Sequence, residues 1–207
     1  MTTKSFRTSN LFLRNEFEPS GKYGFPLIKK QSAHVDYSKL IACSDTSSKE
    51  TEKYRQYGVH FFVDDWRFNG IYYHPEQSIA RFSQYAFLLT PDYSSYNEMQ
   101  PWRQIQSVGM NRWVGAYWQK QGLVVVPTIS WSRRSSFSYC FDAIEKGSVV
   151  AVGMVGCKQA KSSFLVGYNE MLKRIEPSLI ICFGTPFNEM EGNILSVDYM
   201  SSRKKVR

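Results

Sequence analysis

Long apolar segments are absent from the 207-residue sequence. A helix that crosses a bilayer needs about eighteen or more apolar residues in succession, and no such run occurs, so we expect no membrane-spanning helix and no membrane partner. The segment Met1–Asn10 has basic and hydroxyl side chains but no apolar stretch. This composition predicts that the chain carries no secretory signal and is intracellular.

The residue patterns of several enzyme classes are absent as well. No cysteine belongs to a C-x-x-C pair and the three histidines are scattered, which argues against a zinc centre, an iron–sulfur centre or a His-based triad. No G-x-S-x-G elbow of a serine hydrolase is found. The glycines of Val152–Gly156 have neither Walker nor dinucleotide-binding spacing, although a backbone anion site beside Lys158 is an alternative. We expect the four cysteines to be free thiols, mostly in the core.

The overall composition is typical of one globular domain. Hydrophobic residues make up 43% of the chain and charged residues 21%, which excludes a disordered chain and a collagen-like repeat. We expect residues 1–30 to form a leading segment, 31–200 a single α/β domain, and 201–207 a short basic tail. The net charge of +8 and the aromatic share of 15% together favour a polyanionic partner such as nucleic acid.

Short apolar runs of strand length alternate with amphipathic stretches along the chain. The runs are rich in Val, Ile and Phe and do not alternate with polar residues, which is typical of parallel strands buried on both faces. We expect strands at Lys39–Cys43, Val59–Val63, Ala86–Thr90, Leu123–Ile129, Ser148–Val155, Leu179–Phe183 and Asn193–Asp198.

Helical spacing occupies several of the intervals between these runs. Pro75 suits the first turn of a helix that carries Ile79 and Phe82, because its missing N–H costs nothing there. Capping serines and apolar positions three and four apart predict two more helices, over 135–147 and 162–177. The stretch 99–121 is expected to form one or two helices, broken near Gly109.

Strand–helix units in this order predict an α/β fold in which right-handed crossovers place the helices outside a parallel sheet. Seven or eight such strands can close into a small (β/α) barrel, which we favour over the alternative of an open doubly wound sheet. A chain of 207 residues is near the lower limit for a full barrel, so some helices must be short or absent.

Acidic residues follow four of the predicted strands. Ligands of parallel α/β sheets bind beyond the carboxyl ends of the strands, so these carboxylates are expected to meet at one rim. Carboxylates that meet repel each other and need a cation or a raised pKa. We predict that Asp65 and Asp92 are catalytic, and that Mg²⁺ or another divalent cation is held by Asp45, Asp65, Asp92 and Asp198. For each acid alone, the alternative is an ordinary helix cap or turn residue.

Aromatic and basic residues also occur at these strand ends. Trp66 and Trp131 come directly after strands, and Arg103 and Arg112 lie in the tryptophan-rich stretch 99–121. Arg and Trp together can stack on bases or sugars and neutralise phosphate, while the alternative is that the rings pack in the core. We predict that substrate is bound by Trp66, Tyr93, Arg103, Arg112, Trp131, Lys158 and Thr185.

Six segments carry motifs that are specific when taken together. They are GVHFFVDDW at 58–66, FLLTPDYS at 87–94, WRQIQSVGMNRWVGAYW at 102–118, VPTISW at 126–131, YCFDAIEKG at 139–147 and IICFGTPF at 180–187. With these motifs the chain resembles a protein family carried by bacterial phages, prophages and plasmids and filed as a domain of unknown function. The resemblance spans roughly Asn10 to Tyr199. It implies a mobile-element protein in the cytoplasm of a host bacterial cell and no established reaction.

These observations lead to one principal hypothesis and two alternatives. The principal hypothesis is a nuclease-like enzyme of a mobile element that binds single-stranded or distorted DNA and uses a divalent cation for phosphodiester chemistry in replication or processing. The first alternative is a non-enzymatic interaction protein, such as a host-defence antagonist, that binds a host protein. The second is a carbohydrate-active barrel, which we rank last because Glu is scarce at the strand ends and the charge is basic.

Overall fold

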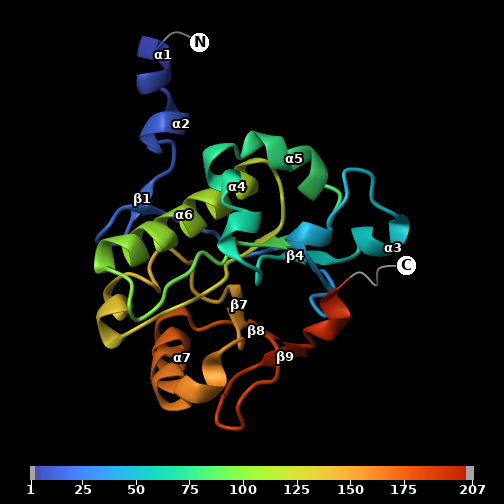
Figure 1. Cartoon of the computed structure of the whole chain (residues 1–207), viewed down its shortest axis with the longest axis vertical. Coiled ribbons are helices and arrows are strands. Elements are labelled where there is room, and N and C mark those ends of the chain that lie inside the picture. Colours follow the sequence, from blue (N-terminus) through green and yellow to red (C-terminus); the bar gives the residue numbers. More distant parts are fainter. Residues whose placement is uncertain (1–2, 204–207) are drawn as a thin grey trace.

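The structure is a computed structural model of the mixed α/β type, with helices packed around parallel strands (Figure 1). It describes residues 3–203. The predicted basic tail therefore lies only partly within the described residues, because residues 204–207 are outside them.

All seven predicted strands are present, and all seven pair in parallel. Within each sheet the hydrogen-bonded order follows the order along the chain, β3-β4-β5-β6 in one sheet and β7-β8-β9 in the other. The strands are β3 (Leu40–Ala42), β4 (Gly58–His60), β5 (Phe87–Leu89), β6 (Val125–Val126), β7 (Val149–Gly153), β8 (Leu179–Phe183) and β9 (Ile194–Val197).

The segment after β6 joins the two sheets. Thr128 forms an isolated parallel bridge with Ala151 of β7, and the amide of Ile129 donates to the carbonyl of Ala151 at 2.8 Å. On its other side, Thr128 donates from its amide to Oγ1 of Thr90 and from its hydroxyl to the carbonyl of Thr90, both at 2.8 Å. The parallel direction of the strands therefore continues from the first sheet into the second.

The predicted closure into a barrel is not confirmed. Apolar side chains of both sheets, among them Leu40, Leu89 and Phe183, do form one buried cluster, and η5 (Met200–Ser202) contacts β3. Within residues 3–203, however, no ladder of hydrogen bonds joins β9 to β3. The strand order also lacks the reversal that an open doubly wound sheet requires, so neither predicted variant describes the sheets fully.

Two long helices flank the strands. In the view of Figure 1, α6 (Pro101–Lys120) lies to the upper left of the central strands and α7 (Lys161–Ile175) lies to the left of β8 and β9. The connections after β3 and β4 contain only short helical turns. The shorter elements are η1 (Cys43–Asp45), α3 (Glu52–Arg55), η2 (Asp65–Arg67), α4 (Gly70–Tyr73), α5 (Glu76–Phe82), η3 (Arg134–Ser138) and η4 (Cys157–Ala160).

The helices expected at Pro75, over 99–121 and over 162–177 are confirmed by α5, α6 and α7, but the break expected near Gly109 and the helix expected over 135–147 are not found. The stretch 99–121 forms one helix without a break at Gly109, whose missing side chain leaves room for Phe25, because a Cβ there would lie 3.3 Å from the Phe25 ring. The segment 135–147 forms only the turn η3. Tertiary pairing prevails over helical spacing there, since Ile144 bridges to Ile28.

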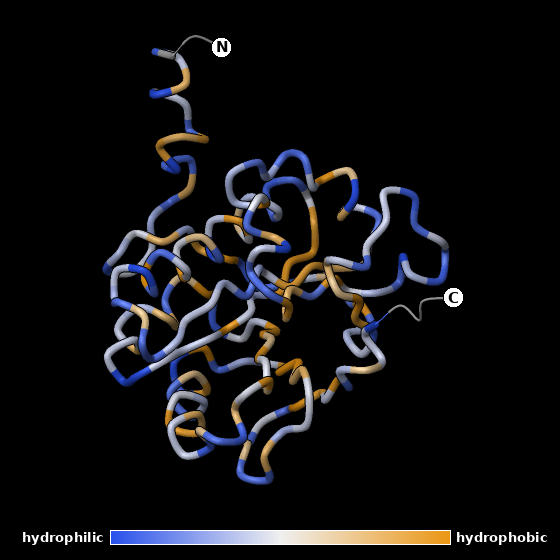
Figure 2. The backbone as a smooth tube through the Cα atoms, in the orientation of Figure 1, coloured by the Kyte–Doolittle hydropathy of each residue, from blue (hydrophilic) through white to orange (hydrophobic). Residues whose placement is uncertain are grey.

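The N-terminal segment consists of a projecting part and a packed part. Helices α1 (Thr3–Arg7) and α2 (Asn10–Leu13) extend away from the body in Figure 1 and keep apolar side chains exposed. The hairpin of β1 (Pro19–Ser20) and β2 (Phe25–Pro26) follows, and Ile28 is fully buried. Figure 2 shows the apolar positions concentrated along the central strands. The second half of the predicted leading segment thus contributes to the core.

Replacing Gly167 with alanine tests the packing of α7. In most helices this change raises stability by about 1 kcal/mol, because alanine is the better helix former. Here the added Cβ would lie 2.1 Å from Nε1 of Trp131, so we expect the free energy of unfolding to fall by about 1–3 kcal/mol. Chemical denaturation measures it. Gly70→Ala, whose Cβ meets nothing within 4 Å, is the control, and a Gly167→Ala protein as stable as the wild type would contradict the packing.

Candidate functional site

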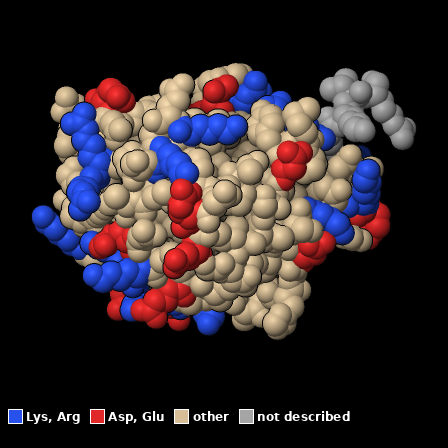
Figure 3. Space-filling view, turned by 90° about the horizontal axis from the view of Figure 1, so that it is seen from below, with Lys and Arg blue, Asp and Glu red and all other residues tan. Residues whose placement is uncertain are grey.

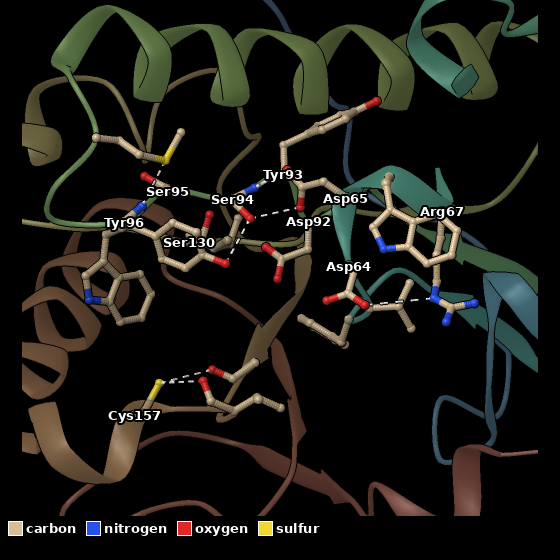
Figure 4. A pocket seen from close by; sticks show the side chains of 18 of the residues that line it. Asp64, Asp65, Arg67, Asp92, Tyr93, Ser94, Ser95, Tyr96, Ser130 and Cys157 are labelled. Atoms are coloured by element: carbon tan, nitrogen blue, oxygen red, sulfur yellow. Dashed lines mark hydrogen bonds and ion pairs between the residues drawn. The ribbon is translucent and has the colours of Figure 1, made fainter. Parts of the chain in front are cut away.

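A pocket of about 860 Å³ opens at the carboxyl ends of the strands. Its lining comes from the segments that follow β3, β4, β5, β6 and β7, from the start of α6 and α7, and from the segment after β9 (Figure 4). Ligand sites of parallel sheets form at this end because the connecting loops converge there. The pocket is therefore the candidate functional site.

Asp65 is held in place by Ser94. The Ser94 hydroxyl donates to Oδ1 of Asp65 at 2.9 Å, and the Ser94 amide donates to Oδ2 at 3.1 Å. The two residues come from the loops after β4 and β5, so this pair of bonds also ties the two loops together (Figure 4). A carboxylate with both oxygens bonded has a defined orientation toward whatever enters the pocket.

Asp92 lacks such support. Its carboxylate faces the pocket near Asp65, and within residues 3–203 no donor bonds to it (Figure 4). Burial raises the pKa of Asp92 to about 7, and the charge of Asp65 adds to this effect. Asp92 can therefore gain or lose a proton near neutral pH, as a general acid or base must.

The rim of the pocket combines exposed aromatic rings with arginines. The Trp66 side chain is 70% exposed and the Arg67 guanidinium lies 4.4 Å from the centre of its ring. Tyr96 is 63% exposed, and its hydroxyl lies 3.2 Å from Oγ of Ser94, to which it can donate. Arg103 also lines the pocket. Three separate segments, η2, the loop after β5 and the first turn of α6, thus supply the rim.

The face of the molecule drawn in Figure 3 is not predominantly basic. On the face shown in Figure 3, which is the underside of the view in Figure 1, Lys and Arg are interspersed with Asp and Glu, and a broad area carries neither. The net charge of +8 is therefore not spread there as one basic surface. The arginines at the rim act as a local feature of the pocket.

Two predicted substrate-binding rings occupy different positions. Trp131 lines the pocket and packs on Phe164, with ring centres 4.9 Å apart. Tyr93 is 4% exposed, packs on Phe68 at 5.2 Å, and turns its ring toward α6 (Figure 4). Trp131 is thus available to a ligand on one side, whereas the ring of Tyr93 belongs to the core.

The four predicted metal ligands are not brought together. Asp65 and Asp92 line the pocket, but Asp45 and Asp198 do not. Asp45 interacts with the neighbouring Ser44, and Asp198 accepts a hydrogen bond from the amide of Ser201 at the start of η5. Within residues 3–203 no group of three or more His, Cys, Asp or Glu side chains is placed to hold a metal ion. Asp64 also lines the pocket but is paired with Arg67 at 4.0 Å, so any cation here would depend mainly on Asp65, Asp92 and the ligand.

Three further predicted binding residues lie outside the pocket. Lys158 and Thr185 are exposed and do not line it. Arg112 is only 2% exposed, and burial lowers the pKa of its guanidinium to about 10. It donates to the carbonyl oxygens of Cys140 at 2.7 Å and Asp142 at 3.0 Å. Arg112 is therefore a structural residue, because the helix turns it inward where backbone carbonyls need donors.

Several pocket residues were not among the predicted ones. Ser94 directly follows Tyr93 and Tyr96 comes two residues later, so extending the predicted site a few residues along this loop includes both. Arg67 follows Trp66 in the same way. Cys157 and Arg203 also line the pocket, and no sequence pattern indicated that Arg203 would reach it.

Comparison with known proteins places the chain in a family. Residues 17–200 match the model of a family described as a domain of unknown function, DUF4417. The chain belongs to the DUF4417 family. The predicted resemblance to a family of unknown function is thereby confirmed, and no reaction is attached to DUF4417 by this description.

The relatives of this DUF4417 chain include phage proteins. The Gene 1 protein of Mycobacterium phage L5 is 34% identical over 177 residues, which are 84% of this chain and 76% of that protein. The Gene 1 protein of Mycobacterium phage D29 is 33% identical over 177 residues, 84% of this chain and 65% of that protein. No solved structure is detectably similar. In the part of the chain that the structure describes, no helix has the length and hydropathy that a membrane crossing requires.

Replacing Arg112 with methionine tests its structural role. The change removes donors from the buried carbonyls of Cys140 and Asp142 and from Oδ1 of Asn111. Buried acceptors without donors are costly, so we expect the free energy of unfolding to fall by about 3 kcal/mol. Arg103→Met, an exposed position on the same helix, should change it by less than about 0.5 kcal/mol. Equal effects of the two substitutions in urea denaturation would show that Arg112 is not structural.

Replacing Asp92 with asparagine tests its environment. Because the pKa of Asp92 is raised in the folded state, the fold loses stability as the pH rises from about 4 to 7, and this loss persists above pH 7. We expect Asp92→Asn to increase the free energy of unfolding by about 1–3 kcal/mol at pH 8 and not at pH 4. Denaturation curves of both proteins at the two pH values measure this. An effect of Asp92→Asn that is the same at pH 4 and pH 8 would contradict the raised pKa.

Proposed function

We propose that this phage-related DUF4417 protein binds single-stranded nucleic acid at the pocket and catalyses phosphodiester chemistry there with a divalent cation. The observation that carries the proposal is the combination of exposed aromatic rings and arginines at the rim with the pair Asp65 and Asp92 further in. Stacking groups and cations suit nucleobases and phosphates, whereas paired carboxylates suit metal-assisted hydrolysis.

The rim supports nucleic acid as the ligand class. Each base has a face that can stack on an aromatic ring, and such contacts contribute about 1–3 kcal/mol per base without sequence preference. Trp66 and Tyr96 offer exposed faces for stacking, and Arg67 and Arg103 stand beside them. Guanidinium groups at these positions can bind phosphates between successive bases.

The acidic pair supports a divalent cation. Mg²⁺ is commonly bound by one or two carboxylates together with water and substrate phosphates, so Asp65 and Asp92 suffice as protein ligands. Asp92, with no donor from residues 3–203 and Asp65 nearby, has a carboxylate that a cation would stabilise. When bound, such a cation neutralises phosphate charge and activates water. Ser94 would keep Asp65 oriented toward that cation.

Fluorescence anisotropy of a labelled single-stranded oligonucleotide tests the binding step. We expect binding that weakens as salt increases, because phosphate contacts release counterions. Trp66→Ala is expected to weaken it about tenfold by removing one stacking platform. The matched control is Tyr73→Ala, because Tyr73 is an exposed aromatic residue that does not line the pocket. The absence of salt-dependent binding would remove nucleic acid as the ligand class.

A second measurement separates binding from chemistry. The same oligonucleotide is incubated with Mg²⁺ or with a chelator, and its length is followed on a gel. Asp65→Asn and Asp92→Asn should abolish scission while the oligonucleotide still binds. Binding without scission in the wild-type protein would contradict the chemistry and favour the non-enzymatic alternative, in which both asparagine variants keep their function.

A further inference from the structure

We infer that the pocket takes the terminus of a single strand, so that the protein acts on strand ends rather than at internal positions. This inference rests on the proposed function and specifies its substrate class. It follows from two features of the described residues, the closed floor of the pocket and the arrangement of groups around its mouth.

The floor of the pocket is closed by aromatic rings from opposite sides of the fold. Phe62, which follows β4, lines the pocket and stacks on Phe183 of β8, with ring centres 4.7 Å apart and planes inclined by 15°. His60 lies against the same Phe183 ring at 4.5 Å, and both residues are buried. Gly153 of β7 completes the floor, since a Cβ on it would lie 2.9 Å from Phe62. A strand can therefore enter this pocket but cannot pass through it.

The mouth is surrounded by side chains from several segments. Trp66 and Arg67 stand after β4, Tyr96 after β5, and Arg103 at the start of α6, while Arg203 lines the pocket from the segment after β9. In Figure 4, Asp65 and Asp92 lie between Tyr96 and Arg67. A phosphate that approaches Asp65 and Asp92 therefore passes near cations and aromatic rings, and also near Asp64, which is paired with Arg67 at 4.0 Å.

This geometry favours a terminus over an internal nucleotide. A terminus brings one length of backbone through the mouth, whereas an internal nucleotide must bring two. The pocket volume of about 860 Å³ is in the range of sites for small ligands and not of an extended groove. The rim cations then contact the phosphates that follow the inserted terminus.

Linear and circular single strands of the same sequence test the inference. They are compared as unlabelled competitors against a labelled linear oligonucleotide, without Mg²⁺. We expect the linear strand to compete at least tenfold better than the circular strand. A longer linear strand at the same molar concentration should compete about equally well. Equal competition by circle and line would overturn the inference and leave nucleic-acid binding intact. Failure of both to bind would instead reject the proposed function on which the inference rests.

A substitution that fills the pocket gives an independent readout. Ser130 lines the pocket and Ser135 is an exposed residue of η3 that does not. Ser130→Phe is expected to weaken linear-strand binding at least tenfold and to leave binding of the circle unchanged, while Ser135→Phe changes neither. Thermal unfolding is recorded for both variants to confirm that they fold. Unchanged linear-strand binding by a folded Ser130→Phe protein would overturn the inference.

Discussion

The two parallel sheets meet through Thr128, and the pocket depends on this contact. On one side its amide and hydroxyl bond to Thr90, and on the other it bridges to Ala151 of β7. Thr90 directly precedes the loop of Asp92, and Ser130 follows Thr128 by two residues. Because a buried polar group without its partner is costly, this contact strongly favours one relative position of the two sheets. The loops after β4 to β7 consequently open into the same space.

Hydrogen bonds from α6 hold the same loops in place. Arg112 donates to Oδ1 of Asn111 at 2.6 Å, and Nδ2 of Asn111 donates to the carbonyls of Pro91 at 2.8 Å and Thr128 at 3.3 Å. Pro91 precedes Asp92, so an arginine far from solvent helps to position the carboxylate that faces the pocket. The tryptophan-rich helix thus serves the site by orienting backbone and not by contacting a ligand with Arg112.

Within the pocket the carboxylates of Asp65 and Asp92 have opposite environments. Asp65 is satisfied by Ser94, whereas burial leaves Asp92 with a raised pKa and a cost to the folded state. Residues that destabilise a fold while facing a cavity are typical of functional sites, because selection keeps them for binding or chemistry. The exposed rings of Trp66 and Tyr96 at the mouth are a similar departure from what stability alone would require.

The apolar runs by themselves determined seven parallel strands, since residues such as Val59, Leu88 and Ile181 can be buried only between covered sheet faces. From that order the strand-end rule located Asp65, Asp92, Trp66 and Trp131 at one pocket. Tertiary structure decided the rest. The helical pattern over 135–147 yielded to the pairing of Ile144 with Ile28, Arg112 turned inward to backbone carbonyls, and Arg203 arrived from the far end of the chain. The spacing of apolar residues indicates which side chains must be buried. Which residues they contact depends on segments that are distant in the sequence, and spacing carries no information about those contacts.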